Sequence, residues 1–224
     1  MDGLIYFVGV VLPYVTLLVF SGGFIYQIVR LARAPLHLHW ELFPYPETLG
    51  GQVSELATEV ATLRSLYLHH RKLWGRSLLM HWGIYLQVLW LLLVLGGWEK
   101  VSWPGFAGGL ACLFGALGIA VWRYTDPEMR TISSPADYLN LFLVALIPLV
   151  GLITGFYGQA DLLRSYLWGI ASFHPIPPAN GPLALNILLI QCFLLYLPFG
   201  RMAHFAAKYF TYHKVKWGEV SRHA

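Results

Sequence analysis

Long apolar stretches, separated by shorter segments that contain charged residues, glycine or proline, dominate this chain of 224 residues. An α-helix needs about 20 mostly apolar residues to cross the hydrocarbon core of a bilayer. The pattern therefore predicts an all-α membrane protein, a five-transmembrane-helix bundle that forms a single membrane domain over residues 1–224. The predicted spans cover about residues 4–29, 77–95, 104–122, 135–157 and 183–207.

Composition agrees with lipid as the main solvent. The chain is 57% hydrophobic and 12% charged, whereas a typical soluble domain has about 25% charged residues. No lysine or arginine precedes Arg30, so we expect the first stretch to be an uncleaved span and not a signal peptide. Ser134, Pro135 and Asp137 have the spacing of a helix N-terminus and mark the start of the fourth span.

The distribution of cations predicts the orientation. All but two of the 15 lysine and arginine residues fall on one side of the five spans, the exceptions being Lys100 and Arg164. Because short cytoplasmic loops are enriched in these residues, the N-terminus is expected outside and the C-terminus in the cytoplasm. The net charge of +4 then reflects topology, and nucleic acid is not an expected partner.

The largest segment between spans is the predicted cytoplasmic loop at about residues 30–76. An irregular, proline-containing stretch at 40–47 is followed by apolar residues that recur every three or four positions. This spacing predicts an amphipathic helix, which would lie on the bilayer surface or dock a partner protein. Its apolar positions are Val53, Leu56, Val60, Leu63 and Tyr67.

The third span is rich in small residues, including Gly108, Gly109 and Gly115. Small residues allow close helix packing or the approach of a flat cofactor, and the pattern favours neither. The two cysteines, Cys112 and Cys192, are too few for an iron–sulfur cluster, which needs about four ligands.

Two of the nine histidines fall inside predicted spans, where ionisable residues are costly and usually functional. His81 lies in the first turn or so of the second span, and His204 in the last turns of the fifth, so both belong to the cytoplasmic half. Two such imidazoles can ligate one haem iron, or they can be ordinary interfacial histidines. Arg201 would then contact a haem propionate or extend to the interface.

Motifs in a characteristic order give the chain a family resemblance. The sequence resembles the cytochrome b (gamma) subunit of respiratory nitrate reductase. It is more similar still to related membrane subunits that partner heterodisulfide-reductase-like iron–sulfur proteins. The motifs are WELFP at 40–44, HHRKLW at 69–74, SLLMHWGIY at 77–85, FAGG at 106–109 followed by Cys112 and Gly115, SPADY at 134–138 and PFGRMAH at 198–204.

In that family two haems b are stacked across the membrane. The resemblance implies that His81 and His204 ligate the haem nearer the cytoplasm. The family's outer ligands correspond to Leu91 and Asn186, and neither is a usual iron ligand. The resemblance also implies a prokaryotic inner-membrane subunit that exchanges electrons between menaquinone or another quinone and an iron–sulfur subunit at the cytoplasmic face.

The sequence hypothesis is therefore a membrane anchor with one haem b, ligated by His81 and His204. With no outer relay, quinone is expected near this haem, with His69, His70 and Gln87 as candidate contacts. A haem-free assembly scaffold is the main alternative. A transporter is the third, although acidic residues within the spans and an inverted repeat, which would favour it, are not apparent.

Overall fold

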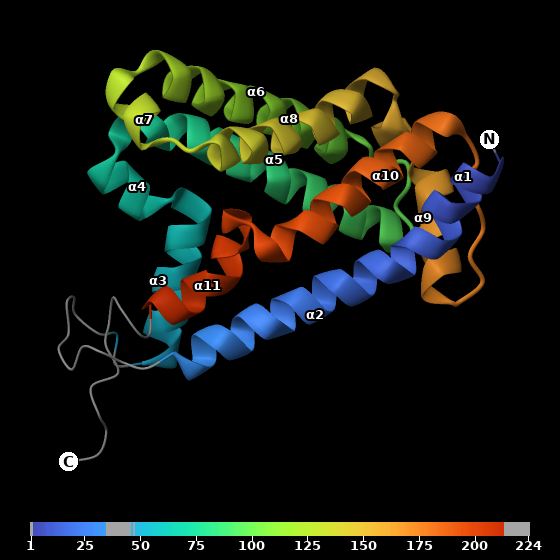
Figure 1. Ribbon diagram of the computed structural model, residues 1–224, viewed down its shortest axis with the longest axis horizontal. Helices are drawn as coiled ribbons and strands as arrows, with labels where there is room; N and C mark the ends of the chain where they lie inside the picture. Colours follow the sequence, from blue (N-terminus) through green and yellow to red (C-terminus); the bar gives the residue numbers. More distant parts are fainter. Residues whose placement is uncertain (1, 35–45, 47, 213–224) are drawn as a thin grey trace. The chain divides into compact units, whose positions relative to one another are not determined.

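The computed structural model describes residues 2–34, 46 and 48–212, and every regular element within them is helical (Figure 1). Five helical stretches are long and apolar enough to cross a membrane. The predicted all-α fold with five spans is confirmed, and the chain is a multi-pass membrane protein. The candidate spans are Gly3–Arg33, Arg71–Leu95, Trp103–Thr125, Pro135–Ile153 and Gly181–Phe199.

The first span is interrupted near its N-terminus. It consists of α1 (Asp2–Tyr6), the π-helical η1 (Phe7–Val11) and α2 (Leu12–Arg33). The second span, α5 (Arg71–Leu95), begins six residues before its predicted start at residue 77. The segment between these two spans is therefore 34–70, somewhat shorter than the predicted loop at 30–76.

The third span is α6 (Trp103–Thr125), and the fourth is α8 (Pro135–Ile153). A short helix, α7 (Pro127–Ile132), connects them. The predicted start of α8 is confirmed, because Asp137 accepts hydrogen bonds from both the backbone nitrogen and the hydroxyl of Ser134 at 2.8 Å. Its predicted end at residue 157 is wrong, since Gly155 turns the chain in the left-handed region (φ 66°), and the 3₁₀ turn η2 (Phe156–Gly158) follows.

The fifth span was predicted as one helix to residue 207, and this is also wrong. The helix α10 (Gly181–Tyr196) gives way to two 3₁₀ turns, η3 (Leu197–Phe199) and η4 (Arg201–Ala203), before α11 (His204–Thr211). Pro198 has no backbone N–H to continue the helix. Gly200 is extended between the two turns (φ −89°, ψ 168°).

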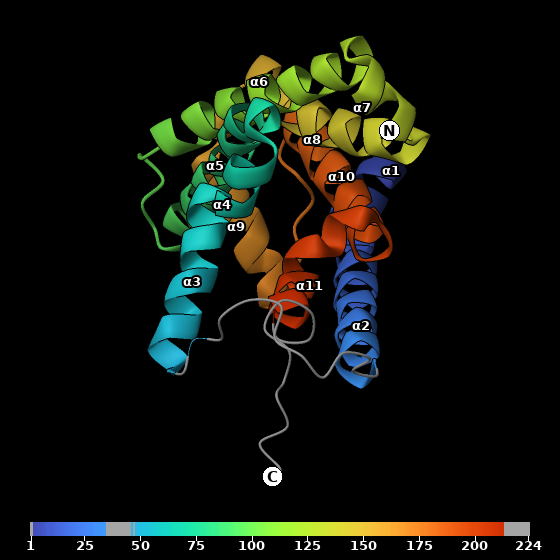
Figure 2. The same cartoon turned by 90° about the vertical axis from the view of Figure 1, so that its left-hand side faces the viewer.

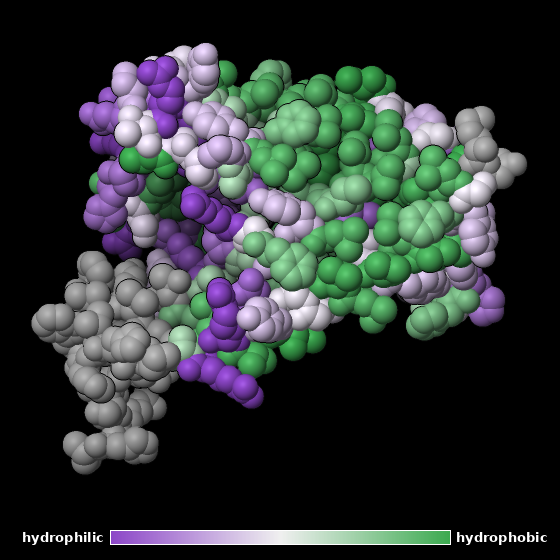
Figure 3. Space-filling model, in the orientation of Figure 1, coloured by the Kyte–Doolittle hydropathy of each residue, from purple (hydrophilic) through white to green (hydrophobic). Residues whose placement is uncertain are grey.

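The chain divides into two compact units. The large unit contains residues 2–15 and 63–193, and the small unit contains residues 16–62 and 194–212 as far as they are described. In the large unit α5 packs against α6, and α6 packs against α8, so that the three helices lie side by side (Figure 1). On the face in Figure 3, apolar side chains cover most of α6 and α8, and hydrophilic ones gather around α7.

The small residues of α6 serve helix packing. A Cβ atom at Gly108 would lie 2.7 Å from the carbonyl oxygen of Gly83 in α5, and one at Gly115 would collide with the backbone of Met80. A Cβ atom at Gly109 would lie 2.8 Å from the Tyr157 hydroxyl. Of the two interpretations of the small residues, close helix packing is the one that these contacts support.

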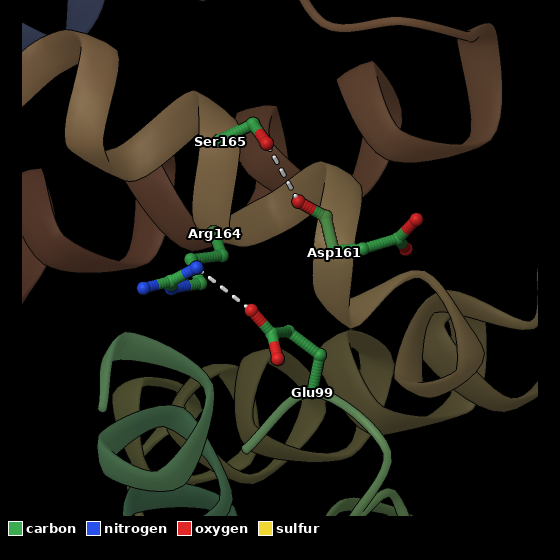
Figure 4. A network of polar contacts seen from close by, with 4 residues as sticks. All are labelled: Glu99, Asp161, Arg164 and Ser165. Carbon is green, nitrogen blue, oxygen red and sulfur yellow. Dashed lines mark hydrogen bonds and ion pairs between the residues drawn. The ribbon is translucent and has the colours of Figure 1, made fainter. Parts of the chain in front are cut away.

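A further helix, α9 (Ala160–Ala171), packs against the core of the large unit, and the sequence analysis did not predict it. Arg164 of α9 donates a 2.8 Å hydrogen bond to Glu99, which lies between α5 and α6 (Figure 4). One of the two cations on the predicted outer side is therefore paired. On the inner face of α9, burial raises the pKa of the Tyr166 phenol to about 12, so the phenol stays neutral.

In the small unit, α3 (Leu49–Thr62) runs crosswise to α2 in Figure 1, and Figure 2 shows the two helices apart from each other. The predicted amphipathic helix is thus present, but it ends at Thr62 because Leu63 adopts a left-handed conformation (φ 51°). The chain continues into α4 (Arg64–His69) of the large unit. The side chains of Leu49, Val53 and Val60 are exposed.

The close packing of α5 and α6 leads to a first prediction. Gly83→Leu should lower the thermal unfolding temperature of the purified protein, because its Cβ atom would meet the backbone of Cys112, which cannot move aside as a side chain can. Overpacking typically costs about 1–3 kcal/mol. Gly75→Leu is the matched control, since nothing lies within 4 Å of that position on the same helix. Equal stability of the two variants would contradict the packing described here.

Candidate functional site

His81 is partly buried on α5, and its ring has a defined hydrogen-bonding state. Its Nδ1 lies 2.7 Å from the carbonyl oxygen of Ser77 and 3.4 Å from the Ser77 hydroxyl. Because a carbonyl oxygen can only accept, Nδ1 is the donor in its contact with Ser77. Metal-bound histidines usually have this arrangement, with the second nitrogen oriented by a backbone carbonyl.

The position of His81 along its helix differs from the prediction. Because α5 begins at Arg71, His81 lies about 15 Å from the start of the helix at 1.5 Å per residue. It is therefore in the third turn of α5 and not in the first. The additional turns at the start of the helix carry Arg71, Lys72 and Arg76, which are exposed.

His204 is the first residue of α11, and its side chain is exposed. It lies beyond the candidate span Gly181–Phe199 and not in the last turns of a continuous helix. Arg201 opens the preceding 3₁₀ turn. Arg201 thus precedes His204 by three residues, across the junction of η4 and α11. His81 belongs to the large unit and His204 to the small unit, and their pairing at one iron stays a prediction.

The two positions expected from the resemblance to correspond to outer haem ligands have different environments. Leu91 of α5 is 37% exposed, whereas Asn186 of α10 is 1% exposed. The Asn186 Nδ2 donates hydrogen bonds to the Thr154 hydroxyl at 2.7 Å and to the Pro182 carbonyl at 2.8 Å. Asn186 therefore joins α10 to the end of α8 by hydrogen bonding.

An aromatic cluster occupies the core of the large unit, adjacent in sequence to Leu91. The Trp90 ring contacts Phe156 and Tyr157 with centroid separations of 5.6 Å and 5.3 Å. The Tyr157 hydroxyl donates to the Gln87 Oε1 at 2.8 Å. Gln87, one of the candidate quinone contacts, thus forms a hydrogen bond between α5 and η2.

Three further contacts, which the sequence analysis missed, join helices where the regular backbone pattern is broken. Pro13 leaves the Val8 carbonyl without its π-helical partner, and Gln191 Nε2 donates to that carbonyl at 3.1 Å. Pro148 likewise removes the donor to Val144, whose carbonyl accepts from the Cys112 thiol at 3.7 Å. In the small unit Gln27 Nε2 donates to the Pro198 carbonyl at 2.9 Å. Amides and a thiol within apolar spans that also contain proline are the signal that could have identified these contacts.

The remaining histidines of the described residues are on the surface. His69 and His70 are exposed at the junction of α4 and α5, and His174 is exposed, with its Nδ1 2.8 Å from the Ser172 carbonyl. Residues 37, 39, 213 and 223, together with the WELFP motif at 40–44, lie outside the described residues. No group of three or more metal-binding side chains occurs within the described part of the chain.

Comparison with known proteins agrees with the motifs. The sequence model of a family described as the nitrate reductase gamma subunit matches residues 99–222. The chain is also similar to the Hdr-like menaquinol oxidoreductase cytochrome b-like subunit of Archaeoglobus profundus, with 23% identity over 259 aligned residues, covering 89% of this chain and 76% of that protein. The protein of the same name from Archaeoglobus fulgidus is 24% identical over 256 aligned residues, covering 91% and 77%.

The family match covers more than half of the chain and includes α6, α8, α10 and the segment with Arg201 and His204. The similarity to the two archaeal proteins extends over about nine tenths of the chain. The resemblance identified from the motifs is thereby confirmed, and this chain belongs to the nitrate reductase gamma subunit family.

Proposed function

We propose that this chain is a haem b-containing membrane subunit that carries electrons between membrane quinone and an iron–sulfur partner. The observation that carries the proposal is the His81 ring, whose Nδ1 donates to the Ser77 carbonyl, the orientation that backbone carbonyls give to metal-binding histidines. Family membership supports it. So do the Archaeoglobus relatives, whose names describe cytochrome b-like subunits of a menaquinol oxidoreductase.

Each residue of the site has a distinct role in this proposal. His81 and His204 would provide the two nitrogens that hold the haem iron, and Ser77 orients the His81 imidazole. The exposed guanidinium of Arg201, one turn before His204, fits a propionate carboxylate. When bound, haem b supplies reversible one-electron transfer. Imidazole is a usual haem ligand and a guanidinium is a usual partner of a carboxylate, so the two histidines and Arg201 fit this cofactor.

One haem per chain is proposed. Asn186 uses its amide for hydrogen bonds to Thr154 and Pro182, and an amide is not a usual haem ligand. The Leu91 side chain has no ligating atom. With one relay, quinone, whether menaquinone or another, is proposed to react near the His81 level. His69 and His70 remain candidates for its polar contacts.

The positions of the cations support the proposed topology, with the N-terminus outside and the C-terminus in the cytoplasm. Arg30 and Arg33 end α2, Arg71 and Lys72 begin α5, and Arg123 lies near the end of α6. These ends face the same side of the membrane if consecutive spans alternate in direction. The side with more lysine and arginine is then cytoplasmic by the positive-inside rule. We propose that the whole chain forms one membrane domain in a prokaryotic inner membrane.

The iron–sulfur partner is proposed to dock on the cytoplasmic segment between the first two spans, over residues 40–67. Within it, α3 has three exposed apolar side chains, Leu49, Val53 and Val60, with exposed fractions of 76%, 57% and 46%. An exposed apolar helix face of this kind suits a groove on another protein. Part of this segment, residues 40–45 and 47, lies outside the described residues.

Replacing either proposed ligand should remove the cofactor. His81→Ala and His204→Ala should each abolish the low-spin haem absorbance in reduced-minus-oxidised spectra of the purified protein, because each leaves one axial position unfilled. His174→Ala, at an exposed histidine, should keep the wild-type spectrum and serves as the control. An unchanged spectrum in either ligand variant would refute the assignment, and a wild-type protein without haem would favour the scaffold alternative.

Replacing Asn186 should lower the stability of the protein and leave its haem content unchanged. Asn186→Leu removes the hydrogen bonds to Thr154 and Pro182. Such bonds in membrane proteins average about 0.6 kcal/mol, with a maximum near 1.7. A double-mutant cycle with Thr154→Val should give a coupling energy in that range, measured by unfolding in mixed detergent. Loss of haem from folded Asn186→Leu protein would mean that Asn186 has a role at a cofactor.

Crosslinking tests the docking segment. A photo-reactive amino acid at position 53 or 60 of α3 should form an adduct with the iron–sulfur subunit in the intact complex, because both side chains are exposed. The same probe at 168 or 173, exposed positions in or after α9 on the predicted outer side, is the control. Mass spectrometry should identify a cysteine-rich subunit in the α3 adducts. Adducts to that subunit from the outer positions alone would place the partner on the other face.

A further inference from the structure

The direction of α11, the helix that begins with His204, is not set by the helix of the fifth span. Two 3₁₀ turns and the extended Gly200 separate α10 from α11. The regular hydrogen-bond pattern that would fix one helix relative to the other is therefore interrupted. The orientation of α11, and of the imidazole at its first position, must therefore depend on contacts with other elements.

Two such contacts lie on either side of His204. Before it, the Gln27 side chain donates to the Pro198 carbonyl at 2.9 Å, and a Cβ atom at Gly23 would lie 2.7 Å from Pro198. This contact holds the start of the interrupted segment against α2. After it, Lys208 Nζ lies 3.1 Å from Glu59 Oε1 of α3.

Lys208 follows His204 by four residues in a continuous helix. Side chains four residues apart lie on the same face of an α-helix, one turn from each other. A contact that fixes the direction of Lys208 therefore also fixes the face of α11 that presents His204. The carboxylate of α3 is in this way connected to the proposed iron ligand through one helical turn.

The burial of Glu59 gives this ion pair a definite geometry. The Glu59 side chain is 6% exposed and that of Lys208 is 32% exposed. A buried carboxylate without a partner is strongly unfavourable, so the pair is expected to persist. Lys208 Nζ also lies 5.3 Å from the centroid of the buried Tyr212 ring, which restricts its position further.

We propose that the Glu59–Lys208 ion pair is a positioning contact that sets the orientation of α11 and thereby of the His204 imidazole at the haem. The inference rests on the proposed function, in which His204 is an axial ligand. It adds that α3, whose exposed apolar side chains form the proposed docking surface, is joined directly to the helix of that ligand. Glu59 acts through Lys208 and touches neither iron nor quinone.

The test uses the full chain, purified with its haem, and the electron paramagnetic resonance spectrum of the oxidised protein. In a low-spin haem with two imidazole ligands, the signal position depends on the relative orientation of the two rings. Glu59→Gln and Lys208→Met should each shift or broaden this signal in folded protein. They should also weaken haem binding roughly tenfold, the low end for changes outside the ligand shell. The exchanged pair, Glu59→Lys with Lys208→Glu, should restore the wild-type signal.

Glu128→Gln, at an exposed carboxylate of α7, is the matched control and should leave the signal unchanged. Wild-type signals in both single variants would overturn the proposal, even if their melting temperatures fall, since a merely structural pair would lower stability alone. A shifted signal that the exchanged pair does not restore would also overturn it. Failure of the proposed function is distinguishable, because it appears earlier, as absence of haem from the wild type or its retention in His204→Ala.

Discussion

Inside the hydrocarbon core of a membrane every backbone N–H and C=O group needs a partner within the protein. Regular helices meet this requirement by themselves, but Pro13, Pro148 and Pro198 each lack a backbone N–H donor within one of three spans. At each of these sites a side chain from another helix donates to a backbone carbonyl. These contacts are Gln191 to Val8, Cys112 to Val144, and Gln27 to Pro198. The prolines within the spans therefore mark places where helices are joined.

The interruption at Pro198 matters most for the proposed function. It separates His204 from the long apolar helix α10 and gives the histidine its own short helix, α11. Such a helix can be oriented by its neighbours in the small unit, in a way that the middle of a span cannot. Around Asn186 and Trp90, by contrast, hydrogen bonds and aromatic rings fill the core of the large unit.

Much of the fold could be predicted from the sequence, because hydrophobic length and capping residues act locally. The five spans, the Ser134–Asp137 cap and the amphipathic α3 all depend on residues near each other in the chain. The family relationship was also apparent from the order of short motifs. The small-residue pattern of α6 predicted close packing as one of two alternatives, and the structure supplied its partner, α5.

Other features depend on tertiary contacts that no local pattern contains. The break before His204 is a different case, because Pro198 and Gly200 are a local signal for it, whereas the predicted fifth span followed the apolar pattern through residues 197–203. Glu59 and Lys208 are 149 positions apart, and the sequence does not distinguish this pair from the other possible pairs of opposite charge. The hydrogen bond between Asn186 and Thr154 joins residues that are 32 positions apart, and no local pattern predicts it. Two histidines could be selected from nine by their positions in apolar sequence. The contact of His81 Nδ1 with the Ser77 carbonyl, however, became visible only in the structure.

The central claim is that this chain holds one haem b with its own two histidines. The most direct measurement is the amount of haem per chain in the purified subunit, from the pyridine haemochrome spectrum and a quantitative amino-acid analysis of the same sample. The account predicts a ratio close to one haem for each chain. A ratio close to two, with both haems retained by this subunit alone, or a ratio close to zero in fully folded protein, would contradict it.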